Sequence, residues 1–126
     1  MLSTGISAVI AIAIIAIGLF YIVNPRVITP SFGLPLPDSG PNTTGWLRLK
    51  GVRDLTMGLL VVASLVWGSA HETGALLLIA AVIPTGDMFT ILAARGSAAK
   101  ALGIHGLTAA VMIMTGLTAL TAAIHL

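Results

Sequence analysis

Arg53 and Asp54 are adjacent ionisable residues that begin a long apolar stretch of the chain, and two later apolar stretches contain Asp87 and His105. Placing a charged side chain inside a bilayer costs at least ~2.5–3.5 kcal/mol, so such residues usually face the protein interior and have a partner. A carboxylate beside an arginine stays ionised and can act as a base, whereas a desolvated carboxyl can hold a proton and act as an acid. These four residues are therefore the candidate catalytic residues.

The composition indicates the environment of these residues. Hydrophobic residues make up 57% of the 126 residues and charged residues 8%, with a mean hydropathy of +1.08. A soluble domain has roughly 25% charged residues, so we predict an integral membrane protein. Because a helix needs about 20 residues to cross the hydrocarbon core, the length allows four spans within one domain.

The order of apolar and polar stretches predicts an all-α protein, a bundle of four transmembrane helices. The expected spans are residues 3–23, 46–68, 74–94 and 101–124, and a proline-rich loop covers 24–45. Trp46 and Trp67 are 21 positions apart. At the helical rise this spacing is ~31 Å, which fits the two interfacial belts of one span. Thr43 or Thr44 is expected to cap the N-terminus of this second helix.

Prolines predict two irregular segments. The loop over 24–45 contains five prolines, which exclude a continuous helix there. Long loops often serve as lids over functional sites, although a surface connector anchored in the interface fits the same residues. In the third helix, Pro84-Thr85-Gly86-Asp87 predicts a kink beside Asp87, because proline removes one backbone hydrogen bond.

The distribution of Lys and Arg predicts the orientation. These residues occur on the side of the 24–45 loop and the 95–100 turn, so the positive-inside rule places both segments in the cytoplasm and both termini outside. Counted from that side, the four candidate residues lie at depths of ~7–12 Å on three different helices. We therefore expect them to meet in one layer of the bundle.

Two classes of function are compatible with this cluster. A cofactor-independent hydrolase or isomerase would act on a lipophilic oxygenated substrate, with an epoxide as the best single choice. One carboxyl of the pair Asp87 and Asp54 would protonate a leaving oxygen while the other activates water. Arg53 would orient both carboxylates, and His105 would assist. The same groups could instead abstract a proton from carbon in a cofactorless oxygenation.

The alternative is a non-enzymatic membrane module, either a small transporter or a partner subunit. In that case the charges would fix the packing of the helices. Arg53 would pair with Asp87, and Asp54 would pair with Lys50 at the i−4 position of the same helix.

The sequence also indicates which partners to expect. We expect no cofactor and no metal, since the chain lacks cysteine and contains no Glu-x-x-His or His-x-x-x-His spacing. The few basic residues form no run, which argues against a nucleic-acid partner. The expected partners are membrane lipids and a lipophilic small molecule. The small residues Gly103, Gly106 and Ala110 could also support a homodimer.

Three short motifs carry a resemblance to known proteins. They are Gly51-Val52-Arg53-Asp54 followed by Gly58, then Pro84-Thr85-Gly86-Asp87, and finally Gly103-Ile104-His105-Gly106. Across nearly its full length the chain resembles a widespread family of small four-helix membrane proteins of unassigned function, DoxX-like in style. It is also similar in size, hydropathy and acid–arginine content to the small membrane-bound epoxide hydrolases of fungal polyene-pyrone biosynthesis. This second resemblance implies an epoxide-opening activity in which Arg53, Asp54 and Asp87 take part.

Overall fold

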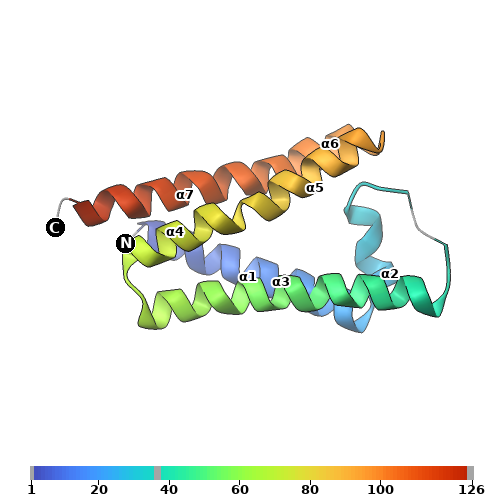
Figure 1. The fold of residues 1–126 in the computed structure, drawn as a ribbon, viewed down its shortest axis with the longest axis horizontal. Coiled ribbons are helices and arrows are strands. Elements are labelled where there is room, and N and C mark those ends of the chain that lie inside the picture. The colour runs from blue at the N-terminus through green and yellow to red at the C-terminus, as the bar shows by residue number, and fades with distance from the viewer. Residues whose placement is uncertain (1, 36–37, 125–126) are drawn as a thin grey trace.

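The computed structural model describes residues 2–35 and 38–124, and these residues form helices and turns but no strand (Figure 1). The helices are α1 (Leu2–Val23), α2 (Pro25–Ile28), the 3-10 turn η1 (Thr29–Ser31), α3 (Pro41–Trp67), α4 (Ala70–Ala80), α5 (Val82–Ala93), α6 (Ala98–Lys100), the π-helical η2 (Ala101–Gly106) and α7 (Leu107–Ile124). Because α4 leads into α5 and α6 leads through η2 into α7, four long helical segments run up and down the molecule (Figure 1). The predicted all-α class is confirmed.

Within the described residues, three helical segments are long and apolar enough to cross a bilayer. They are Leu2–Val23, Ala70–Ala93 and Ala98–Ala122. The chain is therefore an integral membrane protein. The prediction of four spans is supported only in part, because α3 is long enough but carries four charged residues in its N-terminal half. These residues are Arg48, Lys50, Arg53 and Asp54.

The second long helix begins five residues before the expected span of 46–68. Helix α3 begins at Pro41, with Gly40 as its N-cap residue. Proline suits the first helical turn, since the N–H that it lacks would have no partner there. Neither predicted threonine caps the helix, and the Thr44 hydroxyl donates a hydrogen bond to the Gly40 carbonyl oxygen at 3.1 Å. Part of the predicted loop is also helical, because it contains α2 and η1.

The third long segment is interrupted at Ala81, between α4 and α5, and not beside Asp87 as predicted. Pro84 has no N–H to donate to the carbonyl of the preceding turn, so the disturbance falls on the N-terminal side of the proline. Thr85 stabilises this break, because both its backbone N–H and its hydroxyl donate to the Ala81 carbonyl oxygen, at 3.2 and 2.7 Å. Asp87 therefore lies within the regular helix α5.

Glycines bring the long helices together in two close pairs. A Cβ atom on Gly51 of α3 would lie 2.7 Å from the Gly18 carbonyl oxygen of α1. In the second pair, a Cβ atom on Gly74 of α4 would lie 2.8 Å from the Gly116 carbonyl oxygen of α7. Small residues at helix crossings allow this close approach of backbones. The bundle is therefore built from the pair α1–α3 and the pair α4–α7.

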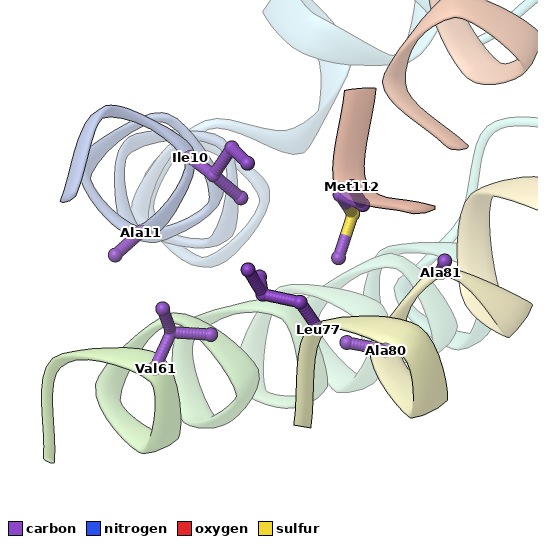
Figure 2. Close-up of a cluster of buried hydrophobic side chains, with 7 residues drawn as sticks. All are labelled: Ile10, Ala11, Val61, Leu77, Ala80, Ala81 and Met112. Atoms are coloured by element: carbon purple, nitrogen blue, oxygen red, sulfur yellow. The ribbon is translucent and has the colours of Figure 1, made fainter. Parts of the chain in front are cut away.

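The two pairs meet in a small apolar core in the middle of the bundle (Figure 2). Its buried residues are Ile10 and Ala11 of α1, Val61 of α3, Leu77 and Ala80 of α4, Ala81, and Met112 of α7. Both termini lie at one end of the bundle (Figure 1). At the other end the two pairs diverge, and α2 with its neighbouring turn fills part of the space between them (Figure 1).

We expect the substitution Gly51→Ala to destabilise the protein by roughly 1–3 kcal/mol, because the added methyl group overpacks the crossing of α1 and α3. Thermal unfolding in detergent micelles would measure the effect. Gly5→Ala is the matched control, since no atom lies within 4 Å of a Cβ at that position. Equal unfolding midpoints for the two variants would contradict this account of the crossing.

Candidate functional site

A cavity of about 150 Å³ lies between the apolar core and the segment that contains α2 and η1. Its polar lining consists of Tyr21, Ser31, Lys50, Asp54, Asp87, His105 and Thr108. Its apolar lining consists of Ile14, Ile17, Ile28, Phe32, Met57, Ala80, Ile83, Pro84, Ile104 and Met112. The site thus combines a cluster of ionisable groups with a mostly hydrocarbon wall, the composition of a pocket for a small apolar ligand with one polar end.

Lys50 is the cation of the cluster. Its Nζ atom lies 2.8 Å from Oδ2 of Asp54, one helical turn later on α3, and 4.0 Å from Oδ2 of Asp87 on α5. The same Nζ atom lies 5.1 Å from the ring centroid of Tyr21 and 5.2 Å from that of Phe32. Two carboxylates and two aromatic faces therefore surround one ammonium group, and both kinds of contact stabilise a positive charge away from water.

His105 connects the ion cluster to the backbone of the loop. Its Nε2 atom lies 2.8 Å from the carbonyl oxygen of Phe32. A carbonyl oxygen can only accept a hydrogen bond, so Nε2 carries a hydrogen and donates it. The other ring nitrogen, Nδ1, lies 3.7 Å from Oδ2 of Asp87. The loop backbone therefore fixes which nitrogen of this buried imidazole faces the carboxylate.

The local fold of η2 helps to position this histidine. Residues Ala101–Gly106 form a π-helical segment between α6 and α7, a distortion that often occurs at functional sites. His105, Thr108 and Met112 are at helical spacing and share one helix face, and all three line the cavity.

The segment after α1 closes one end of the cavity. Ile28, Ser31 and Phe32 line the cavity from this side. The segment is attached to the opposite turn by two hydrogen bonds, from the Ser97 backbone N–H to the Gly33 carbonyl oxygen at 2.8 Å and from Lys100 Nζ to the Pro30 carbonyl oxygen at 2.7 Å. Part of the predicted 24–45 lid therefore covers the site, whereas its residues 36–37 lie outside the described residues.

A left-handed backbone at Gly33 makes this attachment possible. Gly33 has φ +112°, a conformation that glycine adopts at little cost. A Cβ atom at this position would also lie 3.1 Å from the Cβ atom of Lys100. The glycine therefore allows the loop to turn tightly against the residues that begin the fourth long segment.

The structure brings together three of the four predicted site residues, Asp54, Asp87 and His105. Arg53 does not join them, because it is exposed on α3 and does not line the cavity. Adjacent residues of a helix point about 100° apart, whereas residues four apart share a face. A helix that turns Asp54 inward therefore also turns Lys50 inward and Arg53 outward. The expected position of Arg53 between the carboxylates was wrong, and Lys50 occupies it.

Sequence reasoning also missed Tyr21. This residue is 2% exposed and lines the cavity, and its ring faces the Lys50 ammonium group. Tyr21 could have been identified from the sequence, because it is the single ionisable side chain in the first apolar stretch, residues 3–23. Among the described residues, no group of three or more His, Cys, Asp or Glu side chains is arranged to hold a metal ion.

The fold and the site define a small helical membrane protein with an ionisable cluster in an apolar cavity. The chain belongs to the family described as a domain of unknown function, DUF4267, whose model matches residues 11–119. Neither a curated protein nor a solved structure matches the chain. The comparisons thus support an uncharacterised small family and give no support to the resemblance to DoxX-like proteins or epoxide hydrolases.

We expect Lys50→Met to lower the free energy of unfolding by roughly 1–3 kcal/mol, because it leaves the partly buried Asp54 carboxylate without its partner. The matched variant Arg53→Met changes an exposed residue and should shift stability by less than about 0.5 kcal/mol. The double variant Lys50→Met/Asp54→Leu should recover most of the loss, since it removes both charges together. Similar losses for Lys50→Met and Arg53→Met would show that the cation of the cluster has been assigned wrongly.

Proposed function

We propose that this protein is a cofactor-independent membrane enzyme that performs acid–base chemistry on a small lipophilic oxygenated substrate, with epoxide hydrolysis as the specific reaction. The observation that supports the proposal is the open space in front of the ion cluster. Charges that only fix helix packing need no cavity, whereas Lys50, Asp54, Asp87 and His105 all line one. A catalytic site needs a place for the reacting atoms beside its acid and base.

The geometry supports an acid formed by Asp87 and His105 together. Since Nε2 of His105 donates to the Phe32 carbonyl, a neutral ring would direct the lone pair of Nδ1 toward the Asp87 carboxylate. Two lone pairs facing each other in a low-dielectric interior repel, and one proton on either group turns this repulsion into attraction. The same proton makes the cluster neutral, because Lys50 alone does not balance two carboxylates. This pair therefore holds the proton that a leaving oxygen would receive.

The proposed reaction uses the two carboxylates in different roles. The proton held between Asp87 and His105 moves to the epoxide oxygen as one ring C–O bond breaks. A water molecule attacks the carbon of that bond, and Asp54 accepts a proton from this water, so that epoxide and water give a vicinal diol. Lys50 orients Asp54 through their 2.8 Å ion pair and thus takes the role expected for Arg53. Isomerisation of the same substrate class would use the acid without the water.

A second candidate is a non-enzymatic membrane module, a small transporter or a partner subunit with structural charges. The i,i+4 pair of Lys50 and Asp54, which the sequence predicts for this case, favours it. Against it stands the apolar core on one side of the cluster, because a transport path would need polar groups that continue through Leu77 and Met112. A site that does not continue across the bundle fits an enzyme better.

The proposal includes a topology. Helix α3 would serve as the fourth span with its charged face turned toward the cavity, and exposed Trp46 and Trp67 would lie at the two interfaces. The 24–45 loop and the 95–100 turn would be cytoplasmic, and both termini would be outside. A homodimer would use the face of Gly103 and Ala110, which are both exposed.

We expect Asp87→Asn to lower the rate of epoxide hydrolysis at least ~100-fold, because the amide cannot transfer the proton that the leaving oxygen requires. The assay would follow diol formation from epoxyalkanes in lipid nanodiscs, and thermal unfolding would check that the variant folds. Asp38→Asn, in the exposed part of the loop, is the matched control and should retain activity. Full turnover by the Asp87 variant, or no turnover by the unaltered protein with any epoxyalkane, would contradict the proposal.

A further inference from the structure

The cavity is closed along the axis of the bundle in both directions. Toward the termini, Ala80 and Met112 line it and also belong to the buried apolar core. Toward the loop, Ile28 and Phe32 cover it, and the hydrogen bond from His105 Nε2 to the Phe32 carbonyl oxygen fastens this cover. A ligand therefore cannot enter along the axis unless one of these contacts breaks.

The sides of the bundle are more open at this level. Helix α1 contacts α3 and α7 but does not pack closely against η2 in the described part of the chain, and α3 likewise contacts α4 more closely than α5. We call the gap between α1 and η2 the first opening and the gap between α3 and α5 the second. Partly exposed isoleucines that line the cavity lie beside both. Ile17 and Ile104 are 40% and 44% exposed beside the first opening, and Ile83 is 40% exposed beside the second.

The two openings differ in polarity. Between α3 and α5 a chain would pass Lys50, Asp54 and Asp87, whose charged groups come from these two helices. Between α1 and η2 it would pass Ile17 and Ile104. An alkyl chain placed beside charged groups displaces the water or ions that those groups contact, which is unfavourable. The alkyl chain of a ligand would therefore extend through the opening between α1 and η2.

This opening lies at the depth of the bilayer hydrocarbon. Ile17 is six positions before the end of α1 at Val23, and Ile104 is six positions after the start of α6 at Ala98. Both residues are therefore ~9 Å inside the helix ends, well within a hydrocarbon core of ~30 Å.

We infer that the substrate is a membrane-dissolved amphiphile with a single alkyl chain, which enters laterally between α1 and η2. A cavity of about 150 Å³ has the volume that accommodates benzene, so the part that reaches the ion cluster contains about six non-hydrogen atoms. The reactive oxygen belongs to this buried end. The rest of the molecule stays between Ile17 and Ile104 and in the lipid. This inference rests on the proposed function, since it treats the cavity as the substrate site.

A photolabelling experiment tests the entry route without depending on turnover. The full chain in nanodiscs is irradiated with a hexadecyl alcohol that carries a diazirine beside its hydroxyl group, and labelled residues are located by mass spectrometry. We expect labels on the cavity residues Met57 and Met112, and competition by unlabelled hexadecanol. Ile17→Trp and Ile104→Trp should each lower this labelling about tenfold, a change of about 1.4 kcal/mol. The matched variant is Ile113→Trp, at an isoleucine of α7 that is 39% exposed but does not line the cavity, and it should leave the labelling unchanged.

Two other labelling outcomes overturn the inference. Labels confined to exposed outer residues such as Ile12 and Ile79 would show that the amphiphile coats the protein without entering. Loss of labelling in Ile83→Trp but not in Ile17→Trp or Ile104→Trp would place the entrance at the other opening, between α3 and α5. Turnover assays separate this inference from the proposed function. Hydrolysis of epoxybutane without cavity labelling would reject the inference alone, and cavity labelling without turnover of epoxyhexadecane or epoxybutane would reject the hydrolase alone.

Discussion

The placement of a single ammonium group, that of Lys50, between two carboxylates is the interaction on which the site depends. Lys50 contacts Asp54 directly and lies within ion-pair distance of Asp87. Charges held away from water require partners, because each unpaired ion would cost several kcal/mol of desolvation. One ammonium cannot balance two carboxylates, so the proposed mechanism adds one proton to the cluster, and His105, whose Nδ1 lies 3.7 Å from Asp87, offers a second position for it. In that mechanism the charge balance of the cluster provides the proton donor beside the cavity.

The cavity exists because the bundle is tight at one end and spread at the other. Glycine crossings hold each helix pair together, and the core around Leu77 joins the two pairs in the middle of the bundle. Beyond this core the pairs diverge, and α2 lies between them (Figure 1). Ile28 and Phe32 of this segment line the cavity that remains. The crossing of Gly18 and Gly51 lies beside the cavity residues Tyr21 and Lys50, so the packing of α1 on α3 also shapes the site.

The sequence predicted the helical class and the meeting of Asp54, Asp87 and His105, because hydropathy and the fixed rise of a helix determine depth within a span. Depth does not determine direction around the helix axis. Arg53 and Asp54 have nearly the same depth but point about 100° apart, so the cation could be identified only when the inward face of α3 was known. The early start of α3 had a signal in the sequence, because Pro41 suits the first helical turn. The π-helical turn that carries His105 had none, since helix propensity does not distinguish it from a regular helix.

The central claim is that one proton is held between Asp87 and His105 at the cavity while Nε2 of His105 always donates to the loop backbone. Solid-state NMR of the isotopically labelled protein in bilayers tests it most directly, through the ring nitrogen shifts of His105 and the carboxyl carbon shift of Asp87. At neutral pH we expect a protonated Nε2 in every state, together with either a protonated Nδ1 or a protonated Asp87 carboxyl. A neutral His105 with a bare Nδ1 beside an ionised Asp87, or a ring whose Nε2 carries no hydrogen, would contradict it.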